Sequence, residues 1–180
     1  MDLSILKEFC SPYYAHKDMV HNLSHIERVL KYALSIMDKG DYDVNRDILV
    51  YAAYFHGFIY HHETEIILWL RKQHLSPDEV DRIIKVAWES QRNSIPETIE
   101  GRIVPDAHML EGGKTFLVVK SLITGSLRGQ TLEETIQYME DNLIDKGQCY
   151  LPEIAEIYRE QQRFSREFIE DLKEGLMLGT

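Results

Sequence analysis

The sequence predicts an all-α protein, a single domain of about seven helices over residues 1–180. Three observations support this prediction. Apolar residues recur at three- and four-residue steps through most of the chain, and typical helix start and stop residues flank these stretches. No stretch shows the apolar and polar alternation of a half-buried strand. The length of 180 residues, with 44% hydrophobic and 28% charged residues, suits one domain with its own core.

The first predicted helices surround a strongly apolar segment. Residues 24–37 carry one apolar stripe, with Ser24 as the expected cap and a stop at Gly40. Residues 44–59 are apolar nearly all round, which is typical of a helix at the centre of its domain. A shorter helix is expected over residues 63–73.

A capping box marks the start of the next predicted helix. Ser76 is followed by Pro77 at the first helical position and by Glu79 three residues after the serine, and this helix should reach about Ser90.

The second half of the chain predicts a connection and three further helices. Residues 95–105 have prolines near both ends and are expected to be a connection. A helical stretch should begin at Asp106, be interrupted or bent near Gly112 and Gly113, and continue through Leu122. The last two helices are expected over residues 131–145 and 152–178.

Composition excludes several classes of protein. A formal net charge of −10 disfavours binding to duplex nucleic acid as a main role. Cys10 and Cys149 lie in unrelated segments and form no metal or redox motif, so we expect two reduced structural thiols. The first residues lack a signal-peptide pattern, and the most apolar stretch is too polar to span a membrane. The expected location is therefore cytoplasmic.

Three polar residues interrupt apolar surroundings. His25 opens one predicted helix, His56 lies in the apolar central helix, and Asp106 follows the apolar Val104 and Pro105. Two imidazoles and a carboxylate from three helices form a suitable set for a divalent metal ion. The alternative for a single histidine such as His56 is a hydrogen-bonded core residue.

The residues around these three positions carry a resemblance to a known family. The segments His21–Val29, Ala52–Gly57 and Ile103–Ala107 together resemble the HD superfamily of metal-dependent phosphohydrolases. The resemblance implies an HD-type helical bundle. It also implies that His25, His56 and Asp106 are metal ligands and catalytic residues.

One position departs from the family pattern. The family has a His-Asp doublet where this chain has His56 followed by Gly57, so one carboxylate ligand is absent. His61 is the favoured replacement, because it follows Gly57 by four residues and shares its face if the helix continues. His21 and His108 are further candidates. On this interpretation, a Gly57→Asp substitution increases metal affinity.

The resemblance implies metal-assisted hydrolysis of a phosphoester. The expected cofactor is a divalent ion such as Mn²⁺, Fe²⁺, Mg²⁺ or Zn²⁺, although the altered doublet leaves its occupancy open. The expected partner is a small phosphorylated molecule such as a nucleotide, with no duplex nucleic acid and no membrane. Arg28, Lys114 and Lys120 are candidate phosphate ligands. Alternatively, each of the three is a paired or exposed surface residue.

Three functions remain open from the sequence. The first is an active HD-type phosphohydrolase with a degenerate metal site. The second is a catalytically inactive HD-fold module that binds a nucleotide or a protein. The third is a helical interaction protein whose histidines are incidental. The sequence does not fix the oligomeric state, and a homodimer is one option.

Overall fold

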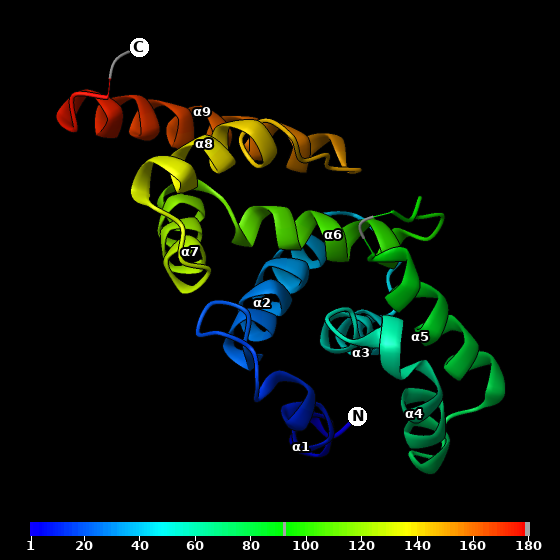
Figure 1. Cartoon of the computed structure of the whole chain (residues 1–180). Helices are drawn as coiled ribbons and strands as arrows, with labels where there is room; N and C mark the ends of the chain where they lie inside the picture. Colours follow the sequence, from blue (N-terminus) through cyan, green and yellow to red (C-terminus); the bar gives the residue numbers. More distant parts are fainter. Residues whose placement is uncertain (92, 179–180) are drawn as a thin grey trace. The chain divides into compact units, whose positions relative to one another are not determined.

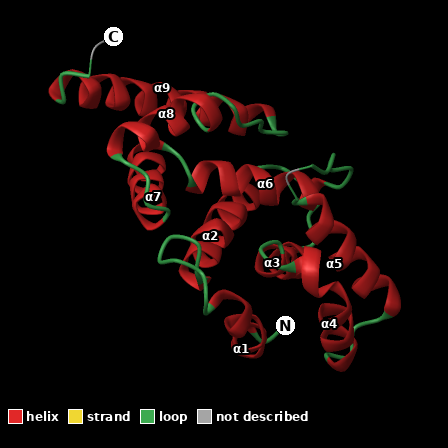
Figure 2. Cartoon of the chain, in the orientation of Figure 1, coloured by secondary structure: helices red, strands yellow, loops and turns green. Residues whose placement is uncertain are grey.

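The computed structural model describes residues 1–91 and 93–178, and within these residues it contains nine α-helices. Figure 1 shows the helices in chain order, and Figure 2 shows that helices and loops account for the whole described part of the chain. The prediction of an all-α protein is therefore confirmed.

The chain divides into two compact units, residues 1–108 and 109–180. This division rests on contacts and does not show whether either part folds alone. The prediction of one domain therefore stays a prediction.

The central helix of the first unit is α3 (Arg46–Phe55). Every residue from Ile48 to Phe55 is buried, so this helix has no solvent-exposed face over that stretch. It packs against α1, α2 and α5. Bounds for the helices around it are α1 (Leu3–Tyr14), α2 (Leu23–Lys39), α4 (Ile59–Lys72), α5 (Pro77–Glu89) and α6 (Ile99–Glu111).

The second unit is built from α7 (Lys114–Leu127), α8 (Leu132–Asn142) and α9 (Pro152–Gly175). Helix α7 packs against both α8 and α9. The buried residues of its core come from all three helices and the loop after α8: Val118, Ile136, Met139, Ile144 and Ile169.

Two differences account for the change from about seven helices to nine. The sequence analysis missed α1, although Leu6, Cys10 and Tyr14 lie four residues apart and are all buried. The stretch after Asp106, which was expected to be interrupted or bent near Gly112 and Gly113, is interrupted there and forms two helices. Gly113 lies so close to Gln161 that a β-carbon would be 1.8 Å from its Oε1 atom, so a side chain does not fit there.

The boundaries of two elements near the predicted site were wrong. The central helix ends at Phe55 rather than near Ile59, and residues 56–58 form a turn before α4. Gly57 is therefore a turn residue and not a residue inside a helix. Helix α6 begins at Ile99, seven residues before Asp106, and it includes Pro105. The proline removes one backbone hydrogen bond, but Ile103 and Val104 are buried beside it and favour the helix.

Several local predictions are confirmed. The capping box at Ser76 and Glu79 is present, and Gly40 ends α2. The cap of α2 is Asn22 rather than Ser24, because the Asn22 side chain accepts a hydrogen bond from the Ser24 backbone. Both cysteines are free thiols. Among the described helices, none combines the length and apolar character that crossing a bilayer needs.

Candidate metal centre

His25 is held in the first turn of α2. The Asn22 cap fixes the start of this helix, and His25 is its third residue. Only 4% of His25 is exposed, because the neighbouring Ile26 and Val29 belong to the buried face of the same helix. The imidazole is therefore directed into the first unit rather than toward solvent.

His56 lies directly after the last residue of α3. Its Nδ1 atom is 2.7 Å from the backbone oxygen of Ala53, and since a carbonyl can only accept, Nδ1 carries the proton and donates. Nε2 is then the ring nitrogen with the lone pair. Histidines that bind metals almost always donate their other ring nitrogen to such an acceptor, which fixes the ring and raises its basicity.

His108 on α6 completes a group of three imidazoles. Its ring centroid lies 5.1 Å from that of His25 and 5.6 Å from that of His56, and the other two centroids are 6.0 Å apart. One ring nitrogen of each histidine lies within 4.8 Å of the other two. The sequence analysis named His108 only as a further candidate, because a helix over residues 99–111 was not predicted.

The three nitrogens fit a transition-metal ion. Nitrogens bound at about 2.1 Å around a tetrahedral ion lie about 3.4 Å apart. The observed separations, all within 4.8 Å, need side-chain movements of only about an ångström to reach this arrangement. Imidazole nitrogen is a preferred ligand of Zn²⁺, Fe²⁺, Ni²⁺ and Cu²⁺.

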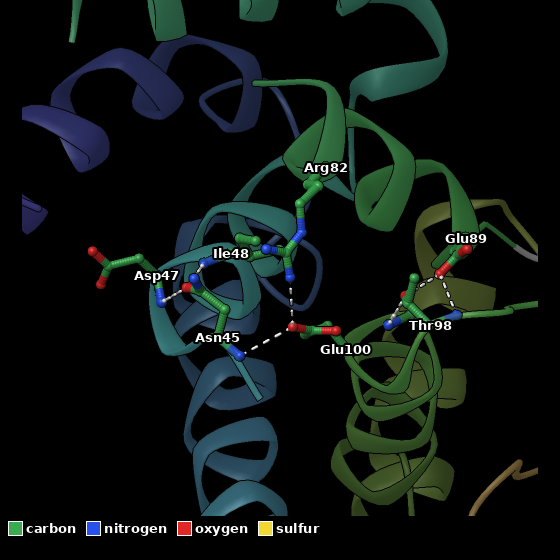
Figure 3. A network of polar contacts seen from close by, with 8 residues as sticks. Asn45, Asp47, Ile48, Arg82, Glu89, Thr98 and Glu100 are labelled. Carbon is green, nitrogen blue, oxygen red and sulfur yellow. Dashed lines mark hydrogen bonds and ion pairs between the residues drawn. The ribbon is translucent and has the colours of Figure 1, made fainter. Parts of the chain in front are cut away.

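A polar network fixes the start of α6 relative to α3 and α5 (Figure 3). The buried Glu89 accepts hydrogen bonds from the backbone and hydroxyl groups of Thr98, and the Thr98 hydroxyl accepts from the Gly101 backbone, so it caps α6. Glu100, also buried, accepts from the Asn45 backbone at the start of α3. These bonds hold the two helices whose other ends carry His108 and His56.

A second link reaches the turn after α3. The side-chain amide of Gln91 donates to the backbone oxygen of His56 over 2.8 Å and also to that of Ala87. Gln91 therefore ties the end of α5 to the turn that carries His56.

Comparison with solved structures identifies the fold. Sequence comparisons with family models and with curated proteins find no match. Lin1889 of Listeria innocua is 21% identical over the full length of both chains, with a TM-score of 0.77. YpgQ of Bacillus subtilis, crystallised with ADP, is 19% identical over 97% of each chain, with a TM-score of 0.78. An HD-superfamily hydrolase of Bacillus thuringiensis is 19% identical over 96% of this chain and 95% of its own, with a TM-score of 0.78.

The chain has the HD-type fold. This confirms the fold that the sequence resemblance implies, and the three-histidine group could hold a metal ion.

Tyr14 occupies the space in which a side chain at position 57 would lie. A β-carbon built on Gly57 would lie 2.5 Å from the Tyr14 hydroxyl and 2.8 Å from the ring. Tyr14 is only 2% exposed, and its hydroxyl donates to the backbone oxygen of Tyr54 over 2.8 Å. Burial raises the pKa of Tyr14 well above its ordinary value, so its phenol stays neutral. A neutral phenol thus fills the space that the side chain of the family's aspartate needs.

Asp106 lies on the same helix as His108 and is fully buried. Residues two apart on a helix do not face each other. The group of three ligand atoms contains His108 and not Asp106. Asp106 as a metal ligand stays a prediction.

His61 is an exposed residue near the start of α4. The helix does not continue from α3 through Gly57, so the four-residue spacing no longer argues for a shared face. The ring of His61 packs against Tyr60 and His62. Its role as a metal ligand stays a prediction.

The three candidate phosphate ligands have different surroundings. Arg28 donates to the Ser24 hydroxyl one turn earlier in α2. Lys114 is exposed at the start of α7. Lys120 lies 3.8 Å from the buried Glu111 carboxylate. Both lysines belong to the second unit, and their contact with a substrate stays a prediction.

His21 is a further imidazole beside the group. Its Nδ1 atom lies 2.8 Å from both carboxylate oxygens of Asp18, and its ring centroid is 6.1 Å from that of His25. Partial burial raises the pKa of the Asp18 carboxyl, but hydrogen bonds from His21 and Val20 outweigh it and hold the pKa below its ordinary value. Asp18 therefore stays ionised and orients the His21 ring.

Proposed function

We propose that the chain is a metal-dependent phosphohydrolase that acts on a nucleotide or another small phosphoester. The observation that carries this proposal is the convergence of His25, His56 and His108 from α2, the end of α3 and α6. Three ring nitrogens from separate helices leave coordination positions for water and substrate, as in catalytic rather than structural metal sites.

The proposed ligands are His25, His56 and His108. The alternative, which the family resemblance implies, has Asp106 in place of His108. A divalent ion held there, which on the family pattern is Mn²⁺, Fe²⁺, Mg²⁺ or Zn²⁺, would supply Lewis-acid activation of a phosphoryl oxygen and of water near neutral pH. The Ala53 backbone oxygen holds the His56 ring with Nε2 available for binding. His21, oriented by Asp18, supplies an imidazole next to this group for proton transfer.

The surface next to His25 supports binding of an anion. An open hollow of about 340 Å³ lies between the end of α1 and the start of α2, and Lys17 and Ser24 line it. The first residues of α2 also line this hollow, and a helix N-terminus favours a negatively charged group. Arg28 is one turn further along the same helix. Lys114 and Lys120 are retained as proposed phosphate ligands.

The structural neighbours are consistent with this substrate class. YpgQ was crystallised with ADP, and the Bacillus thuringiensis neighbour is described as an HD-superfamily hydrolase. A nucleotide therefore heads the substrates to be tested. The proposal includes a cytoplasmic location and a homodimer.

One observation favours the second candidate, an inactive HD-fold module that binds a nucleotide or a protein. Tyr14 fills the place of the doublet carboxylate, so the charge that normally offsets the ion is absent. If the remaining ligands bind no ion, the hollow next to α2 can still bind a phosphate without hydrolysing it.

A hydrolysis screen separates the two candidates. The purified protein is incubated with nucleoside mono-, di- and triphosphates and with each of the four metal ions, and released phosphate and pyrophosphate are measured. The proposal predicts metal-dependent turnover that the His56→Ala variant loses and the His74→Ala variant keeps, since His74 is exposed at the end of α4. Nucleotide binding without turnover under every metal condition would favour the inactive module.

A further inference from the structure

The candidate metal centre differs from the HD pattern in the chemistry of its ligands. The group of ligand atoms within 4.8 Å of one another consists of three imidazole nitrogens and includes no carboxylate oxygen among the described residues. The HD pattern pairs two histidines with two acids. His108 therefore brings a nitrogen to a site where the fold usually brings oxygen.

The space for the usual carboxylate is closed by the packing of α1. Tyr14 is buried and bonded to the Tyr54 backbone, and it leaves no room for a side chain on Gly57. Lys17 donates to the Gly57 backbone oxygen over 2.8 Å, which fixes the same turn from its other side. Two residues from the end of α1 and the loop after it thus hold the turn, and a side chain at position 57 would have to displace Tyr14.

The two acidic alternatives have other placements. Asp106 is two residues before His108 on α6, so the two side chains leave the helix on different faces. Asp18 is engaged by the His21 ring and by two backbone N–H groups.

We infer that the His25, His56 and His108 centre selects nitrogen-preferring ions such as Zn²⁺, Co²⁺ and Ni²⁺, and that His108 is the residue that excludes Mg²⁺ and disfavours Mn²⁺. Imidazole suits Zn²⁺, Co²⁺ and Ni²⁺, whereas carboxylate oxygen suits Mg²⁺ and Mn²⁺. Three neutral ligands also leave the full double charge of the ion, which an anionic substrate can offset. This selectivity rests on the metal site of the proposed function and not on its hydrolytic step.

The experiment measures the binding of each metal alone by isothermal titration calorimetry. Most protein sites bind Zn²⁺ more tightly than Mn²⁺ by a general trend, so the informative quantity is the ratio of the two dissociation constants and its change on mutation. The wild-type protein should bind Zn²⁺, Co²⁺ and Ni²⁺ at one site per chain and show no heat with Mg²⁺.

The decisive variant is His108→Asp, which exchanges the nitrogen for an oxygen at a half-buried position. The ratio of the Mn²⁺ to the Zn²⁺ dissociation constant should fall by about tenfold or more relative to wild type, through weaker Zn²⁺ and stronger Mn²⁺ binding. The matched control is His74→Asp, at an exposed position with a positive φ of 60° that aspartate tolerates. Its ratio should equal that of wild type.

Two results overturn the inference. One is Mg²⁺ or Mn²⁺ binding to the wild-type protein as tightly as Zn²⁺, and the other is an unchanged ratio in a folded His108→Asp protein. If that variant does not fold by circular dichroism, the wild-type protein with Co²⁺ decides the question. The inference is supported if Zn²⁺ displaces the bound Co²⁺, if Co²⁺ has nitrogen ligands, and if Co²⁺ shifts the NMR signals of the His108 ring. Unshifted His108 signals refute it.

Failure of the proposed function leaves a different pattern. A protein that binds Zn²⁺ through His108 but hydrolyses no phosphoester keeps this inference and refutes the phosphohydrolase. A protein that hydrolyses nucleotides best with Mn²⁺, with His108→Asp unchanged in metal preference, keeps the phosphohydrolase and refutes the inference.

Discussion

The two ends of α3 use buried polar groups in opposite ways. At its start, the Glu100 carboxylate meets a backbone N–H group of Asn45 and the Arg82 guanidinium, so an acceptor faces donors. At its end, about 15 Å away for a ten-residue helix, three imidazoles from different helices face one another. Hydrogen-bond donors paired with acceptors stabilise a fold without any ligand. Several imidazole nitrogens that lie close together are instead the arrangement that binds a metal ion.

The difference indicates which residues are structural and which are functional. Glu89 and Glu100 are as deeply buried as His25, yet both acids have identified donors that hold helices together. Burial of a charged residue is therefore not sufficient to identify a site in this molecule. The partners of the buried group show whether it is structural or functional. Mutations at the histidine end should therefore change metal affinity, and mutations at the Glu100 end should change the free energy of unfolding.

The largest expected effect is the loss of metal binding from the histidine end. His56→Ala removes one of three nitrogens and should weaken Zn²⁺ binding by about 100-fold or more. Calorimetry measures the affinity, and thermal unfolding without metal should show only a small change, because His56 is half-buried at the end of its helix. An unchanged affinity would mean that the three histidines do not bind the ion.

Gly57→Asp should be the next largest effect, and its sign is opposite to the expectation from sequence alone. The new side chain meets the Tyr14 ring and hydroxyl, so the free energy of unfolding should fall by about 1–3 kcal/mol, with no gain in Mn²⁺ affinity. The double variant Tyr14→Ala with Gly57→Asp should bind Mn²⁺ more tightly than Tyr14→Ala alone. Denaturant unfolding and metal titration test both parts. A stable single variant with increased Mn²⁺ affinity would contradict the role given to Tyr14.

At the structural end, Glu100→Ala should lower the free energy of unfolding by about 1–3 kcal/mol, because it removes the partly buried, charge-assisted hydrogen bond from the Asn45 N–H group. Zn²⁺ stoichiometry should remain one per chain. Glu97→Ala is the matched control: its carboxylate pairs with Lys85 at the surface, so its removal should change the free energy of unfolding much less. Equal effects of the two substitutions would show that the buried network does not stabilise α3 and α6.

The smallest expected effect is at a surface cap away from both ends of α3. Ser76→Ala should cost about 1 kcal/mol through loss of the capping box. Hydrogen bonds from the Ser76 side chain and backbone lower the pKa of Glu79, so the stabilisation from these bonds is complete above the ordinary pKa of 4.5 and is lost as the pH falls through the lower folded value. Urea unfolding between pH 3 and pH 7 measures the difference in the free energy of unfolding between the wild type and the Ser76→Ala variant. A difference that grows toward low pH would contradict the assigned hydrogen bonds.

Sequence periodicity predicted the helical class and most helices because local propensity and the buried stripe agree there. The two wrong boundaries near the site involve contacts between distant segments. Helix α6 was placed too late because its start depends on Thr98 meeting Glu89 from α5, and a helix containing Pro105 is locally disfavoured. The break at Gly57 depends on Tyr14, which lies in a helix that was not predicted.

The candidate site was predicted in part for the same reason. His25 and His56 stand out in sequence because each interrupts or opens an apolar helix. His108 does not stand out, since only the correct span of α6 brings it to the other two. The spacing argument for His61 depended on a helix that continues past His56, and α3 ends before it. Local patterns thus located the helices of the site, and tertiary packing selected its third imidazole.

The most direct test of the account is an anomalous diffraction map from crystals of the protein soaked with Zn²⁺, collected on both sides of the zinc absorption edge. The account predicts one strong peak per chain within bonding distance of ring nitrogens of His25, His56 and His108. A map with no peak among these three residues, or with a peak bound by other side chains and not by His108, would contradict it.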